Sequence, residues 1–262
     1  MNAEPPLDRL RALPKAEVHA HLEGCFEPAV LEQWAAQAGV PMPRPRDRLL
    51  QFEGLADFLH FLDWACGLAS TRERLAALSY GYSRRLADSG AGYADVIVNP
   101  THWTAWHGRL PAMIDAIDAG LAEAEQDGLP PVGLCVSLLR TQSADAAAEI
   151  VDALVALRHP RVVALSIDGN EAAAGRTGPR FAEAFRRAGA AGLRRTVHAG
   201  ESSGPEGVAA RGFGALVTGA WHRAAQVQCR VERVRRYFQR QLVPKPCCLR
   251  LAHFLFGSDP PT

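Results

Sequence analysis

Two histidines separated by one residue are the first side chains in this sequence whose spacing could support chemistry. His19 and His21 lie in residues 13–24, which we interpret as a short strand and the turn that follows it. Side chains alternate between the faces of a strand, so the two imidazoles should point the same way and converge on one cation. Histidine is the commonest nitrogen ligand of zinc. The pair predicts part of a metal site, although most such pairs in proteins are ordinary surface or core residues.

A second candidate motif occupies residues 196–201. His198 ends an apolar run, and Glu201 follows three residues later. A histidine at a strand end can complete a metal site, while a nearby carboxylate can give a proton to the same substrate and take one from it. The plainer interpretation is a core histidine beside a solvated glutamate.

The rest of the chain must supply the elements that position these residues. Helical spacing and caps predict helices, and β-rich apolar runs predict strands between them. Parallel neighbours need crossover connections, so this alternation predicts a parallel sheet covered by helices. The expected strands are 13–21, 93–98, 132–138, 162–167 and 194–197, and the expected helices are 27–39, 55–68, 71–88, 110–126, 143–158 and 179–190.

Polar residues stand where each apolar run stops, and they indicate which kind of parallel sheet this is. In a (β/α)₈ barrel, catalytic groups gather at the C-terminal ends of several strands. A dinucleotide-binding open sheet would carry a G-x-G-x-x-G turn after its first strand, and none is present there. We therefore predict a TIM-type (β/α)₈ barrel, incomplete because only about five strands are recognisable. The strand-end residues are His19, His21, Asn99, His102, Arg140, 168–171 and 198–201.

Three of these stretches together resemble the adenosine and adenine deaminase family. Residues 13–24 are similar to the family's opening metal-ligand motif, and the His-Ala-Gly-Glu run at 198–201 to its second signature. Between them, residues 166–171 resemble the segment whose glycine contacts the purine. The resemblance covers roughly residues 10–208.

The resemblance implies a zinc-dependent hydrolase that removes ammonia from a 6-aminopurine such as adenine or adenosine. It assigns one Zn²⁺ per chain to His19, His21 and His198, and proton transfer to Glu201. Gly169 and Glu23 would contact the purine. A glutamate at position 23 is more typical of the adenine-specific branch, where the adenosine-specific branch usually has aspartate.

The resemblance fails after Glu201. The family should continue with a histidine that orients the attacking water and, later, a metal-binding aspartate. His222 stands 21 residues beyond Glu201 and is a candidate for the first; Asp259 is a weaker candidate for the second. Only 61 residues follow Glu201, whereas three more strand–helix units need about 90.

The charge changes at the same place. Residues 207–262 hold nine basic and two acidic residues. We divide the chain into a deaminase-like portion, 1–206, and a basic tail, 207–262, that is not an independent domain and has the character of a frameshifted or divergent end. Two alternative functions stay open: a non-catalytic remnant that binds metal or purine and, resting only on the arginine-rich tail, a nucleic-acid binder.

Composition restricts the class of protein and its expected location. The chain is 48% hydrophobic but has no run of 18 apolar residues and no segment typical of a signal peptide, so we expect a cytoplasmic protein without a membrane anchor. Its six cysteines are scattered, which suits reduced thiols. The expected partner is a small purine, and nucleic acid is not favoured.

Overall fold

The computed structural model describes residues 13–174 and 178–198 of the 262-residue chain. Glu201, His222 and Asp259 lie outside the described residues, as does the whole of the basic tail. The sheet and helices below therefore concern the predicted deaminase-like portion alone.

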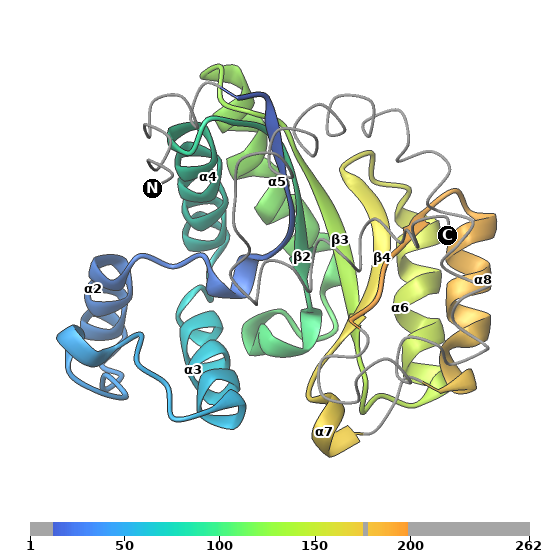
Figure 1. Ribbon diagram of the computed structural model, residues 1–262, viewed down its shortest axis with the longest axis horizontal. Helices are drawn as coiled ribbons and strands as arrows, with labels where there is room; N and C mark the ends of the chain where they lie inside the picture. Colours follow the sequence, from blue (N-terminus) through green and yellow to red (C-terminus); the bar gives the residue numbers. More distant parts are fainter. Residues whose placement is uncertain (1–12, 175–177, 199–262) are drawn as a thin grey trace, which may run out of the picture.

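Five parallel strands form one sheet in the order in which they occur along the chain (Figure 1). Their apolar residues bury both faces of the central strands, as expected when parallel strands are covered by crossover helices. This confirms the five predicted strands. They are β1 (Lys15–His21), β2 (Ala91–Val98), β3 (Val132–Leu139), β4 (Val162–Asp168) and β5 (Arg194–Arg195).

β5 is shorter than predicted, but its pairing with β4 continues beyond it. The backbone N–H of Thr196 donates to the carbonyl of Leu165 at 2.9 Å, and that of His198 donates to Ile167 at 3.0 Å. The chain therefore stays extended beside β4 as far as His198.

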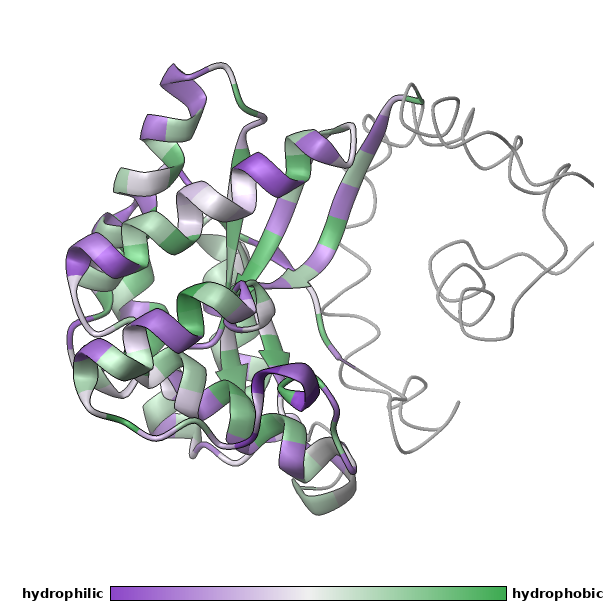
Figure 2. Ribbon diagram, turned by 90° about the vertical axis from the view of Figure 1, so that its left-hand side faces the viewer, coloured by the Kyte–Doolittle hydropathy of each residue, from purple (hydrophilic) through white to green (hydrophobic). Residues whose placement is uncertain are grey.

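The crossover helices lie together on one side of the sheet (Figure 2). Two begin at the predicted caps, because Thr71 and Ser143 each accept a hydrogen bond from the backbone N–H three residues on. Their apolar sides pack on β1–β4 in a single core. These helices are α4 (Arg72–Asp88), α5 (Leu110–Gln126), α6 (Ala144–Leu157) and α8 (Ala182–Ala190).

The remaining helices follow the C-terminal ends of the strands, toward the bottom of Figure 1. Several contact one another there, including α3 with η1, η3 and η4. These short helices and α3 therefore pack together at the C-terminal end of the sheet. The elements are α2 (Pro28–Ala38), α3 (Leu55–Leu68), α7 (Glu171–Ala174) and the 3₁₀ helices η1 (Leu22–Gly24), η2 (Arg46–Arg48), η3 (Pro100–His102), η4 (Thr104–Trp106) and η5 (Pro179–Phe181).

The strand order separates the two architectures considered for the sequence. A doubly wound sheet reverses its strand order at a switch point, whereas a barrel adds each new strand on the same side. The order β1-β2-β3-β4-β5 has no reversal. Among the described residues β1 and β5 are the two edges of the sheet, so this part is an unclosed piece of a barrel.

Two of the expectations from composition concern features that the structure describes. None of the described helices is long and apolar enough to cross a membrane. Cys25, Cys66 and Cys135 are free thiols, and burial raises the pKa of Cys25 to about 12, which keeps it protonated.

Gly120 is the closest approach of α5 to α4. A Cβ atom there would lie 1.9 Å from the carbonyl oxygen of Ala76, which is backbone and cannot move aside. We expect Gly120→Ala to lower the free energy of unfolding by about 1–3 kcal/mol through overpacking. Urea denaturation followed by circular dichroism measures this.

Gly81, in α4, provides the matched control. Its Cβ would meet only the flexible end of Arg85, at 3.6 Å. Gly81→Ala should leave stability unchanged or raise it by up to ~1 kcal/mol through helix propensity. Equal effects of the two substitutions would show that α4 and α5 are not packed this tightly.

Candidate metal and purine site

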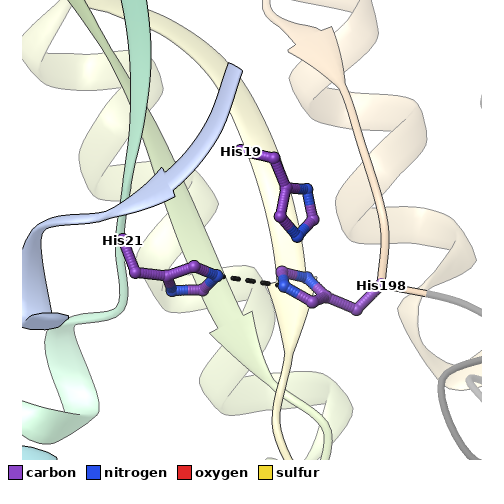
Figure 3. A group of neighbouring side chains, drawn as sticks. All are labelled: His19, His21 and His198. Atoms are coloured by element: carbon purple, nitrogen blue, oxygen red, sulfur yellow. Dashed lines mark hydrogen bonds between the residues drawn. The ribbon is translucent and has the colours of Figure 1, made fainter. Parts of the chain in front are cut away.

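Three histidine side chains meet at the C-terminal end of the sheet (Figure 3). His19 and His21 come from β1, and His198 follows β5. The Nε2 atoms of His21 and His198 are 3.0 Å apart, and one nitrogen from each of the three rings lies within 4.8 Å of the others. The sequence prediction that these histidines form one cluster therefore has the geometry it requires.

The meeting of these rings shows that the sheet is strongly curved. Neighbouring strands are about 4.8 Å apart, so four steps across a flat sheet would separate β1 from β5 by about 19 Å. His21 and His198 nevertheless touch, because the sheet curls and both side chains point into its concave side. The site therefore depends on barrel-type curvature.

His19 reaches the cluster through an irregularity in β1 rather than by simple alternation. Its φ is +67°, in the left-handed region, and the pairing register of β1 with β2 shifts between Val18 and Ala20. A regular strand was expected here, and that part of the prediction was wrong. The bulge re-aims the ring of His19, whose centroid lies 4.1 Å from that of His198.

His198 is held in the form that binds metal. Its Nδ1 lies 3.0 Å from the carbonyl oxygen of Ile167, which can only accept, so Nδ1 carries the proton and Nε2 keeps its lone pair. Burial lowers the pKa of His198 to about 3, helped by His19 and His21. Burial and His21 likewise lower the pKa of His19. Neutral imidazoles are the form that coordinates a cation.

The donor set fits a zinc ion. Zinc–nitrogen bonds of 2.0–2.1 Å at a tetrahedral angle place two ligand nitrogens about 3.3 Å apart. The 3.0 Å between the Nε2 atoms of His21 and His198 is close to that spacing. Three imidazoles leave one tetrahedral position for water or substrate, as in catalytic zinc sites.

Two buried carboxylates lie on the other side of the His21 ring. Its Nδ1 is 3.7 Å from Glu23 Oε2 and 3.9 Å from Asp168 Oδ2. Neither oxygen has a hydrogen-bond partner among the described residues. Burial and the neighbouring Glu23 raise the pKa of Asp168. These acids favour a proton on Nδ1, which places the lone pair of His21 on Nε2, the nitrogen that faces His198.

Glu23 is anchored by two donors. Its Oε1 accepts from the backbone N–H of Asn99 at 2.6 Å and from the indole N–H of Trp103 at 2.9 Å. The side chain of Asn99 donates in turn to Asp168. Asn99 and Asp168 were expected here as strand-end residues. Trp103 was missed, because nothing in its spacing distinguishes it from an apolar core residue.

Gly169 directly follows β4 and has a φ of +102°. A Cβ atom at this position would lie 2.8 Å from Leu139 Cδ1. Both the conformation and the space therefore require glycine. Its contact with a purine stays a prediction.

His102 is the strand-end residue that does not join the cluster. Its Nδ1 lies 2.6 Å from Asp63 Oδ1 of α3. Its role is to tie η3 to that helix.

The left-handed backbone of His19 generates a test of strain at the site. An alanine in this region is strained, whereas a glycine is not. In the presence of a chelator we expect His19→Gly to be about 1 kcal/mol more stable than His19→Ala. Urea titrations measure the difference.

His21 supplies the opposite control, because its φ is −105°. There the alanine variant should be the more stable of the two, since glycine only adds unfolded-state entropy. If glycine and alanine rank in the same order at both positions, the bulge at His19 stores no strain.

Comparison with known proteins agrees with this geometry. The family model described as "Adenosine deaminase" matches residues 14–211. An adenine deaminase of Bordetella avium is 33% identical over 204 residues, which are 76% of this chain and 63% of that protein. The chain thus spans about three-fifths of the length of the curated relatives it matches.

Solved structures show the same relationship. The crystal structure of adenine deaminase from Arthrobacter aurescens superposes with a TM-score of 0.67 at 28% identity, covering 76% of this chain and 61% of that one. An amidohydrolase from Burkholderia ambifaria with bound Zn gives a TM-score of 0.66 at 30% identity, covering 74% and 54%. The neighbours confirm the predicted fold, and one of them holds Zn. Because the matched residues contain both histidine motifs and the strand end between them, this chain belongs to the adenosine deaminase family.

Proposed function

We propose that this chain carries the site of a zinc-dependent hydrolase that deaminates a 6-aminopurine, adenine or adenosine. The observation that carries the proposal is the convergence of three imidazoles at the C-terminal end of a curved parallel sheet. His19, His21 and His198 would hold the ion. Zn²⁺ held by three nitrogens with a fourth position open supplies Lewis acidity and makes water more acidic, which is the chemistry of hydrolysis.

The reaction replaces the amino group of the purine with an oxygen from water. A carbon–oxygen bond forms, the carbon–nitrogen bond breaks, and ammonia leaves. Glu201 is proposed to protonate the adjacent ring nitrogen, which makes the carbon more electrophilic, and then to carry protons toward the departing ammonia. His222 is proposed to orient the water. Both residues lie outside the described part of the chain.

The purine would lie beside the backbone of Gly169, which itself has no side chain. Glu23 is proposed as the second purine contact. Its Oε1 is already occupied by Asn99 and Trp103, but Oε2 has no hydrogen-bond partner among the described residues. A carboxylate oxygen in this state can accept from a ring N–H of the substrate. The relative from Bordetella avium is named an adenine deaminase. Free adenine offers such an N–H donor in its five-membered ring.

A second candidate function is a non-catalytic remnant that binds zinc or purine. It is favoured by the extent of the family match, which stops at residue 211. The division of the chain into a deaminase-like portion, 1–206, and a divergent tail, 207–262, stays part of this proposal. The remnant would keep the three histidines and lack turnover.

Replacing Glu201 tests the proposed reaction. We expect Glu201→Gln to lower turnover of adenine or adenosine by at least ~10², as for the loss of a general acid and base, while zinc stays bound. Ammonia release and metal analysis measure the two effects. Glu183→Gln, an exposed carboxylate on α8, is the control and should retain full turnover.

Two results would contradict this assignment. Full activity in the Glu201→Gln protein would remove its proposed role. Zinc binding by the unaltered chain without any ammonia release would favour the remnant.

Replacing Asp168 tests the carboxylate support of His21. Asp168→Asn keeps the size of the side chain but removes the charge facing Nδ1, so zinc affinity should fall by about 10–100-fold. Competition with a chromophoric chelator measures it. Asp63→Asn breaks the carboxylate–histidine pair formed with His102 and should leave zinc affinity unchanged. Equal zinc affinities of all three proteins would show that Asp168 does not support His21.

A further inference from the structure

We propose that Arg140 is a positioning residue that aligns two parts of the site at once: the metal ligand His198 and the peptide of Gly169. The half of the proposal that concerns purine binding rests on the proposed function. The half that concerns His198 needs only the histidine cluster.

Arg140 follows β3 and its guanidinium joins the next two strands at their C-terminal ends. Its Nε donates to the carbonyl of Gly169 at 3.1 Å, and its Nη2 donates to the carbonyl of His198. Its backbone N–H donates to the carbonyl of Asp168 at 2.9 Å. The residue is only 1% exposed, so water does not compete for these bonds.

Both carbonyls belong to segments that the sheet itself holds weakly. Gly169 lies beyond the end of β4 in a left-handed conformation. His198 lies beyond the two-residue β5, and its bond to Ile167 is the last of the pairing within the described residues. A planar guanidinium donates through several N–H groups in fixed directions, so it can hold two carbonyls at a set separation.

Fixing a carbonyl also fixes the plane of the peptide group to which it belongs. The Gly169 carbonyl belongs to the peptide that leads into α7, and the other carbonyl belongs to the metal ligand His198. Arg140 therefore fixes the orientation of one backbone carbonyl beyond the end of each of two neighbouring strands.

Arg161 shows what an arginine with a purely structural role does in the same sheet. It donates to Asp118, to Glu125 at 2.6 Å, and to the carbonyl of Val132 at 2.9 Å. Val132 begins β3 and Arg161 precedes β4, so this network lies at the opposite, N-terminal end of the strands. Its loss should destabilise the fold without affecting the histidines.

The test compares full-length Arg140→Met, Arg140→Lys and Arg161→Met with the unaltered chain. Zinc affinity is measured by competition with a chromophoric chelator, and ligand geometry by the visible absorption spectrum of the Co²⁺-loaded protein. We expect Arg140→Met to bind zinc at least about tenfold more weakly, in the range for residues that orient ligands, and to show a changed Co²⁺ spectrum. Arg161→Met should lower the melting temperature and leave both metal readouts unchanged.

Arg140→Lys guards against loss of folding, because it keeps the charge and most of the alkyl chain. A single ammonium cannot donate to both carbonyls in the fixed directions of a guanidinium. The zinc affinity of Arg140→Lys should therefore lie between those of the unaltered chain and Arg140→Met. Wild-type zinc affinity and Co²⁺ spectra in both Arg140 variants would overturn the proposal. Equal losses in Arg161→Met would overturn it too, because they would show general destabilisation.

Adenine binding to the zinc-saturated proteins, measured by calorimetry, tests the Gly169 half. We expect weaker binding in Arg140→Met and unchanged binding in Arg161→Met. Unchanged adenine affinity in Arg140→Met would overturn this half. If the unaltered zinc-loaded chain binds no adenine, the proposed function fails, while the zinc and Co²⁺ measurements still decide whether Arg140 positions His198.

Discussion

The contact between His21 and His198 is the constraint on which the rest of the site depends. Their Nε2 atoms are 3.0 Å apart although their strands are the two edges of the described sheet. A flat sheet would keep such edges about 19 Å apart. The contact therefore requires the curvature of a barrel-type sheet, and a flatter sheet would separate the ligands.

Bringing three imidazoles together has a cost that other parts of the fold offset. His19 occupies a left-handed conformation that a non-glycine residue adopts only under constraint. Glu23 and Asp168 are almost fully buried, and each leaves one carboxylate oxygen without a hydrogen bond among the described residues. Such features are unfavourable in a site without a function. They are expected where a histidine must coordinate a cation and buried carboxylates must orient that histidine.

The support of this site comes largely from backbone carbonyls. Ile167 accepts from both the backbone N–H and the Nδ1 of His198, which fixes the position and the tautomer of one ligand. Arg140 holds the carbonyls that follow. Carbonyls at the ends of parallel strands are not all used by the sheet, so side chains at this end can bind them. This is one physical reason why functional side chains at strand ends can be held in place without changes to the core.

Local pattern was sufficient to predict the strands, the helices and the three histidines, because each depends on residues near in sequence. Buried runs such as β3, the caps at Thr71 and Ser143, and the strand-end position of His198 are of this kind. The resemblance of three short motifs to one family was confirmed by the match over residues 14–211.

Tertiary structure decided the rest. The left-handed bulge at His19, the role of Trp103 as a donor to Glu23, and the guanidinium that joins Gly169 to His198 all depend on residues distant in sequence. No local spacing encodes such contacts. The sequence by itself determined which residues could bind a metal, and the curvature of the sheet decided that they meet, because convergence across five strands is a property of the whole sheet.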